Sequence, residues 1–298
     1  MLIETQLPDL LHRGKVRDTY QIDADLLLMV TTDRISAFDV VLPTGIPEKG
    51  RVLNKMSGFW FDQTKHLIPN HLVALADDPD VAGKFSDSEL MRNLPTQVAR
   101  QAMIVKKAER IDIECVVRGY ITGSAWSEYQ KQGTVSGQRM PSGMVEGDAF
   151  PEPLFTPTTK AEQGHDENMT ADEVIAIAGA DLARQLEEVT KTVYRFGHDY
   201  ARERGIVLAD TKLEFGLLHG ELILIDELFT PDSSRFWDMD GFNPGRSQPS
   251  FDKQIVRDWL IEQGWDREPP APELPPDIVA RTSERYLEAY RRLTGAGL

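Results

Sequence analysis

The sequence predicts an α+β protein with two lobes. Its first hundred or so residues contain short β-compatible runs separated by Gly, Pro and Asp: Lys15–Gln21, Asp25–Thr31, Phe38–Leu42 and Gln101–Lys107. Amphipathic helices and a β-hairpin follow in the second half. At 298 residues the chain is long enough for such a two-lobed unit. We expect an antiparallel N-terminal lobe over residues 1–110, an α+β lobe over 111–264, and a Pro-rich connector with a terminal helix over 265–298.

Start and stop signals place the individual helices. They are expected over about Asn54–His66, over Ser124–Gln132, as a short helix opened by the capping box Thr170–Glu173, as a longer helix that ends at Gly205, and over about Ile278–Leu293. Residues Gly133–Pro157 are rich in Gly, Pro and Ser, and this composition predicts a long loop.

Composition limits the classes of function. The formal net charge is −15 and the pI is about 4.9, which argues against a nucleic-acid-binding protein because such proteins cluster Lys and Arg. The single cysteine, Cys115, excludes an intramolecular disulfide and lies in an apolar strand, where an inert thiol is expected. No run of about 18 apolar residues predicts a membrane span. The cytoplasm is therefore the expected compartment.

The hairpin around His219-Gly220 carries the strongest chemical pattern. Asp210, Lys212 and Glu214 alternate with apolar residues, so their side chains share one face of a strand. Asp226 directly follows the apolar run that forms the second strand. A solvated face would also show such charges, but two acids and a lysine inside a core-like hairpin favour a cation site.

The length of the hairpin loop decides whether the two acids can meet. A two-residue loop pairs Glu214 with Ile225 and directs Asp226 to the other face. A three-residue loop, Leu218-His219-Gly220, or an equivalent bulge, returns Asp226 to the face of Glu214. We therefore expect the longer loop.

Basic residues at strand ends and turns are candidates for anion binding. Arg118 ends a strand and Ser124 is expected to cap the next helix, where free N–H groups suit a phosphate, although an ordinary cap with a surface arginine fits equally well. Lys15 follows a glycine turn, and Lys106 ends a strand, where a solvated lysine is the alternative. A polar segment that contains Lys160 and Asp166 is a candidate lid over a polar substrate, with a solvated loop as the alternative.

Taken together, several strings resemble the SAICAR synthetase family: GKVRDTY, TTDRISAFDVVLPTGIPEKG, ECVVRGYITGS, FTPTTKAEQGHDEN, LADTKLEFG and DELFTPDSSRFW. The resemblance runs from about residue 10 to 260, and LADTKLEFG and ECVVRGYITGS in that order are highly specific. It implies a two-lobed α+β nucleotide-binding fold, distantly similar to kinases and ATP-grasp enzymes, with ATP held between the lobes.

The resemblance also implies roles for individual residues. Glu214 and Asp226 would bind Mg²⁺, and Lys15, Lys106 and Asp210 would contact ATP. The implied substrate-binding residues are Arg118, Ser124 and Arg235, with Asp33, Arg34 and Ser36 as further contributors. The implied catalytic residues are Lys212, Lys160 and Asp166.

The implied reaction joins L-aspartate to the carboxylate of carboxyaminoimidazole ribotide (CAIR) at the expense of ATP, in purine biosynthesis. An acyl phosphate would activate the carboxylate for attack by the amine. Two alternatives stay open: a small-molecule kinase, which needs no amine, and a non-enzymatic nucleotide-binding module. The partners expected are small molecules only, and the sequence leaves monomer or homo-oligomer undecided.

Overall fold

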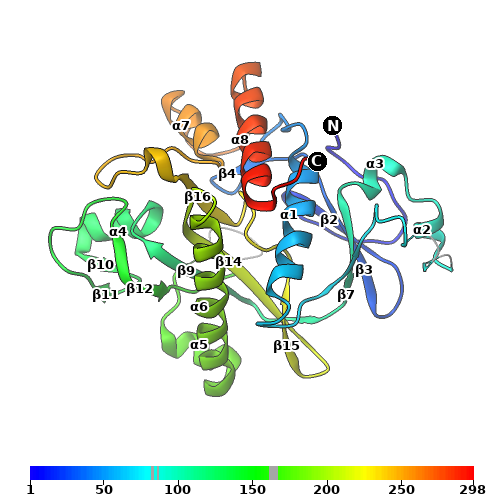
Figure 1. Cartoon of the computed structure of the whole chain (residues 1–298), viewed down its shortest axis with the longest axis horizontal. Helices are drawn as coiled ribbons and strands as arrows, with labels where there is room; N and C mark the ends of the chain where they lie inside the picture. The colour runs from blue at the N-terminus through cyan, green and yellow to red at the C-terminus, as the bar shows by residue number, and fades with distance from the viewer. Residues whose placement is uncertain (82–83, 86, 161–166) are drawn as a thin grey trace.

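The computed structural model describes residues 1–81, 84–85, 87–160 and 167–298. Two antiparallel sheets lie side by side with helices around them (Figure 1). The α+β class is therefore confirmed. The five-stranded sheet ends with Lys106 and the larger sheet begins with Glu109, close to the expected boundary, but the three-part domain division stays a prediction because one apolar core contacts both sheets.

The N-terminal sheet has five strands in the order β1-β2-β3-β7-β6. Their bounds are β1 (Leu10–Arg13), β2 (Arg17–Gln21), β3 (Leu26–Thr31), β7 (Ala102–Lys106) and β6 (Leu72–Leu75). Two short helices, α2 (Glu89–Arg92) and α3 (Thr96–Ala99), precede β7, and β4 (Ser36–Ala37) pairs with β5 (Val40–Val41). The strands expected from the sequence in this lobe are present.

The larger sheet is built around β14 (Ile206–Leu218). The first part of β14 pairs with β9 (Ile113–Tyr120) and β16 (Ser234–Asp238), and its last part pairs with β15 (Glu221–Ile225) and β8 (Glu109–Arg110). The remaining strands, β12 (Ala149–Phe155) and β13 (Thr158–Thr159), pair with β9. A separate hairpin joins β10 (Thr134–Val135) to β11 (Gln138–Arg139).

Helices connect and cover the sheets. In Figure 1, α6 (Ala180–Arg202) crosses the larger sheet and α1 (Lys49–Thr64) stands between the two sheets, close to α8 (Pro276–Thr294). The other helices are α4 (Gly123–Gln132), α5 (Ala171–Ala178) and α7 (Gln254–Glu262), with the 3-10 turn η1 (Met239–Gly241). None of the helices within the described residues is long and apolar enough to cross a membrane.

The prediction of a continuous loop over residues 133–157 is wrong, because this segment contains three strands. The longest of them, β12, lies at the edge of the larger sheet and includes Pro151 and Pro153. Proline cannot donate to a ladder and is tolerated at an edge, and the register of β12 is accordingly interrupted between Ala149 and Leu154. The prolines that favoured a loop in the sequence therefore belong to an irregular edge strand.

The hairpin prediction is correct, but its loop is shorter than expected. Leu218 pairs with Glu221, and only His219 and Gly220 form the turn. Both have positive φ, 53° and 83°, as a type I′ turn requires. Glu214 pairs with Ile225, so the prediction of a three-residue loop is wrong.

Candidate active site

A large cleft of about 2150 Å³ runs between the two sheets and along one face of β14. Its volume is more than twice that of a pocket for one drug-sized ligand, which is about 300–1,000 Å³. Asp210, Lys212 and Glu214 all line it, whereas Leu213 and Phe215 are buried in the core. The alternation predicted for this strand is therefore present, and the cleft has room for several small molecules.

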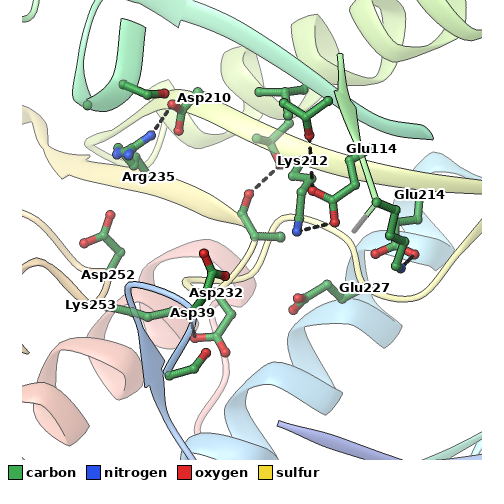
Figure 2. A pocket seen from close by; sticks show the side chains of 18 of the residues that line it. Asp39, Glu114, Asp210, Lys212, Glu214, Glu227, Asp232, Arg235, Asp252 and Lys253 are labelled. Carbon is green, nitrogen blue, oxygen red and sulfur yellow. Dashed lines mark hydrogen bonds and ion pairs between the residues drawn. The ribbon is translucent and has the colours of Figure 1, made fainter. Parts of the chain in front are cut away.

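One end of the cleft presents two arginines that share a carboxylate. Asp210 on β14 forms ion pairs with Arg118 on β9 and Arg235 on β16. Figure 2 shows Asp210 and Arg235 facing each other at this end. Two cations against one anion leave a net positive charge, which suits an anionic group such as a phosphate.

Glycine lets the Arg235 side chain approach the start of α4. Gly123 has a φ of 58°, and a Cβ there would lie 2.5 Å from Nη2 of Arg235. Ser124 is close by, since Nη2 of Arg118 donates to its Oγ at 3.2 Å. Ser124 lies inside α4 and Thr122 is the N-cap, so the prediction that Ser124 caps the helix is wrong.

Two lysines occupy the middle of the cleft and pair with glutamates. Nζ of Lys212 lies 2.7 Å from Oε1 of Glu114 on β9, as the dashed line in Figure 2 marks. Lys160 forms an ion pair with Glu214. Both lysines line the cleft, so both ammonium groups are placed to contact a bound substrate.

The other end holds the acid pair predicted for a cation. Burial and the nearby charge of Asp226 raise the pKa of Glu214, although Lys160 and Lys212 oppose this shift. Burial alone would raise the pKa of Asp226 as well, but Arg17, with Nη1 2.5 Å from Oδ1 of Asp226, together with Lys160 and Lys212 lowers it. The second carboxylate that Arg17 binds is Glu227, 2.6 Å away.

Asp226 reaches Glu214 by a route that differs from the one expected. The regular strand ends at Ile225, and Asp226 has a φ of 66° in the left-handed region. This single residue turns the backbone after the last pair of the ladder, so the carboxylate returns to the cleft without a longer loop. Burial lowers the pKa of His71 to about 4, and this neutral ring hydrogen-bonds the backbone of Asp226.

A further carboxylate, Asp232, lies in the connection between β15 and β16 and binds three side chains. Its Oδ2 lies 2.7 Å from Nζ of Lys49, the first residue of α1. Its Oδ1 lies 3.5 Å from Nζ of Lys253 and accepts a hydrogen bond of 2.8 Å from Tyr286 on α8. Asp232 and Lys253 line the cleft, and Figure 2 shows them next to each other.

The remaining predicted residues divide into two groups. Lys15, Lys106 and Ser36 line the cleft. Asp33 and Arg34 are not among the residues that line it, and their contact with substrate stays a prediction.

Backbone groups occupy both of these side chains. Oδ2 of Asp33 accepts from the N–H of Leu2 at 2.6 Å, and Oδ1 accepts from the N–H of Gly50 at 2.9 Å. Arg34 donates to the carbonyls of Ile3, Lys15 and Gly14 and pairs with Asp18 at 2.7 Å. They anchor the chain next to the cleft. Asp166 lies outside the described residues.

Several cleft residues escaped sequence reasoning because their partners are distant in the chain. Arg17 and Asp226 are 209 residues apart, and Lys49 and Asp232 are 183 apart. The only local signal is position: Arg17 follows the Lys15 turn and Glu227 follows Asp226. Glu114, Asp232 and Lys253 offered no spacing that separates them from ordinary surface charges.

Known proteins match this chain over nearly its whole length. The SAICAR synthetase family model matches residues 10–272. Phosphoribosylaminoimidazole-succinocarboxamide synthases from Maridesulfovibrio salexigens and Methylococcus capsulatus are 50% and 52% identical, over 100% and 95% of this chain and 98% and 93% of theirs.

Solved structures agree with these matches. The SAICAR synthase of Saccharomyces cerevisiae, complexed with SAICAR, is 44% identical with a TM-score of 0.89, over 100% of this chain and 99% of its own. A type-2 SAICAR synthetase in complex with ADP is 26% identical with a TM-score of 0.70, over 96% of this chain and 98% of its own. The resemblance expected from the sequence is confirmed, and the chain belongs to the SAICAR synthetase family of purine-biosynthesis ligases.

Proposed function

We propose that this protein condenses L-aspartate with the carboxylate of CAIR, using ATP, to form SAICAR, ADP and phosphate. The observation that carries the proposal is the single face of β14, where Asp210, Lys212 and Glu214 line one cleft. This face runs from an arginine pair to an acid pair, so one strand spans an anion site and a cation site. The names of the related structures, one with SAICAR and one with ADP, support both kinds of ligand.

The ribotide phosphate would bind at the arginine end. Arg118 and Arg235 offer planar guanidinium groups to phosphate oxygens, and Ser124 adds a hydroxyl. Asp210 holds both arginines in place, so we assign it to this end rather than to the nucleotide contact implied by the resemblance. Ser36 lines the same cleft and remains a candidate for the substrate pocket.

The nucleotide would lie on the side of the N-terminal sheet. Lys15 and Lys106 line the cleft there, and their ammonium groups would contact phosphate oxygens. Glu214 and Asp226 fit Mg²⁺, which takes one or two carboxylates and completes its shell with phosphate and water. Burial and the nearby charge of Asp226 raise the pKa of Glu214, and a cation bound between the two acids would offset both effects.

The reaction needs an activated carboxylate, because a free carboxylate is a poor electrophile. The γ-phosphoryl group would move to a carboxylate oxygen of CAIR, which forms an acyl phosphate and releases ADP. The aspartate amine would then attack the acyl carbon, and phosphate would leave with the electron pair of its C–O bond. Bound Mg²⁺ would supply neutralisation of the charge on the transferring phosphate.

The described side chains would carry the remaining tasks. Lys212 and Lys160 would stabilise negative charge on the carboxylate and the transferring group, because both ammonium groups line the cleft between the two ends. The two lobes would align three substrates and exclude water from the acyl phosphate. Asp166 as the acceptor of the amine proton, and the cytoplasm as the compartment, stay predictions.

The test is ADP release by the purified protein with Mg-ATP and CAIR, with and without L-aspartate, together with mass spectrometry of the product. The proposal expects ADP release that depends on aspartate and a product of succinocarboxamide mass. Aspartate-independent ADP with a stable phosphorylated product would indicate a kinase. No turnover with any combination would favour a nucleotide-binding module.

A further inference from the structure

The terminal helix α8 lies behind the wall of the cleft and beyond the family match, which ends at residue 272; none of its residues lines the cleft, but Tyr286 contacts Asp232, which does. The helix packs against α1, and its buried residues Tyr286, Ala289 and Leu293 belong to the main core. Packing alone explains the apolar face of this helix. It does not explain why Tyr286, fully buried, directs its hydroxyl to a carboxylate that lines the cleft.

The two carboxylate oxygens of Asp232 contact different partners. Oδ2 takes the ammonium of Lys49, which is fully buried and does not line the cleft. Oδ1 takes the Tyr286 hydroxyl at 2.8 Å and faces Nζ of Lys253 at 3.5 Å. The hydrogen bond from Tyr286 thus fixes the rotation of the Asp232 carboxylate about the Cβ–Cγ bond. It thereby determines which oxygen Lys253 approaches.

The longer contact leaves Lys253 able to bind something else. An ammonium group has three donors, and a separation of 3.5 Å is an ion pair rather than a short hydrogen bond. Asp232 carries one negative charge and is shared by the two ammonium groups of Lys49 and Lys253. Burial lowers the pKa of Lys253 despite Asp232, and an anion placed against its ammonium would offset that cost.

We propose that Tyr286 is a positioning residue for the cleft: through Asp232 it holds the Lys253 ammonium where it binds a carboxylate or phosphate oxygen of one substrate. This inference rests on the proposed function, because it assigns Lys253 to an anionic group of one of the three substrates. It makes the terminal helix part of the binding machinery. Tyr286 itself touches no substrate.

The test is steady-state kinetics of the full chain with each of ATP, CAIR and L-aspartate varied in turn. Tyr286→Phe removes one hydrogen bond to a charged group, and we expect the KM for one substrate to rise about fivefold to tenfold. Lys253→Met should raise the KM for the same substrate by more, about 100-fold, since it removes the cation and keeps the stem. An effect on the KM for ATP indicates a phosphate oxygen and an effect on the KM for L-aspartate indicates a carboxylate oxygen, whereas an effect on the KM for CAIR fits either of its two anionic groups.

The double variant separates positioning from a merely structural role. If Tyr286 acts through Lys253, then Tyr286→Phe should change that KM by less than about twofold in the Lys253→Met background. The matched control is Tyr290→Phe on the same helix, since within the described part of the chain the Tyr290 hydroxyl has no hydrogen-bond partner. KM does not depend on the fraction of active enzyme, so partial unfolding of a variant leaves this measurement valid.

Two results would overturn the proposal. One is an unchanged KM for all three substrates in Tyr286→Phe, and the other is a full, independent effect of this substitution in the Lys253→Met background. Either result leaves the proposed function standing, because that depends on aspartate-dependent ADP release by the unaltered protein.

Discussion

In two parts of the same cleft, the pKa values of carboxylates are shifted in opposite directions. At Glu214, burial and the nearby charge of Asp226 raise the pKa, although Lys160 and Lys212 oppose this shift. At Asp232, a single buried acid lies between Lys49 and Lys253, and these cations lower its pKa far below the ordinary value in spite of burial. Ionised Glu214 therefore destabilises the folded protein at neutral pH, whereas ionised Asp232 stabilises it.

Both places already hold cationic side chains, with Lys160 at Glu214, Arg17 at Asp226, and Lys49 and Lys253 at Asp232, but only at Glu214 is the pKa raised. A bound metal ion gives the largest stabilisation to a carboxylate whose ionised form the folded protein disfavours. A carboxylate that already holds two ammonium groups stabilises the fold and places those groups. Sequence position gives no hint of the contrast, since Asp226 and Asp232 are only six residues apart.

The largest effect should follow from Glu214→Gln. Loss of one metal-binding carboxylate should lower kcat/KM about 10³-fold, because transition-state charge is no longer neutralised. The ligand-free variant should unfold at a temperature no lower than the unaltered protein, since the folded pKa of Glu214 is raised and its ionised form costs stability above that pKa. Activity assays and thermal unfolding with and without Mg-ATP measure both.

The matched control is Glu221→Gln on the exposed end of the same hairpin, which should leave both quantities unchanged. A Glu214→Gln variant that Mg-ATP stabilises as well as it does the unaltered protein would remove Glu214 from the metal site.

Asp232→Asn should produce the largest loss of stability. It leaves Lys49 and Lys253 without their carboxylate in a buried setting, and removal of one partner of such a pair costs about 3–5 kcal/mol. Urea unfolding at pH 7 measures the free energy. Asp112→Asn breaks the exposed pair with Arg110 and should cost only about 0–1 kcal/mol. Equal losses in the two variants would contradict the contrast between the sites.

The pH dependence of that loss follows from the lowered pKa of Asp232. A carboxylate whose folded pKa is depressed contributes stability that is fully present above its unfolded pKa of about 3.9. The difference between the unaltered protein and Asp232→Asn should therefore be constant from pH 7 to about 5. It should shrink as the pH falls below about 4. A difference that declines already between pH 7 and 6 would point to another group.

The smallest effect is expected at the arginine end of the cleft. There Asp210, like Asp232, lies between two cations, one of which is Arg235. Gly123→Ala should push Arg235 away from its place, since the new Cβ would lie 2.5 Å from Nη2. We expect the KM for the ribotide to rise about tenfold, as lost contacts of this kind cost about 1–2 kcal/mol. Gly133→Ala is the control, because Gly133 also has positive φ but open space around it. A similar rise in KM in both variants would show that strain at a positive φ, and not displacement of Arg235, causes the rise.

Local sequence patterns correctly predicted the capped helix and the alternating strand, because both depend on residues close together in the chain. The capping box at Thr170 and Glu173 is present, with reciprocal hydrogen bonds, and α6 ends near Gly205 as expected. The alternation along β14 placed Asp210, Lys212 and Glu214 correctly, because the side-chain period of a strand is fixed. The prediction for residues 133–157 was wrong because edge strands tolerate the prolines that ordinarily indicate a loop.

By itself the sequence determined the α+β class, the family and the strand face that carries the central charges, since each depends on local order or on long, specific strings. The tertiary structure decided which charges meet: Arg17 with Asp226, and Tyr286, Lys49 and Lys253 with Asp232. It also decided that Asp33 and Arg34 anchor backbone instead of facing the cleft. The physical reason is distance along the chain, because ion pairs between residues about 200 positions apart depend on how the lobes pack and leave no periodic trace in the sequence.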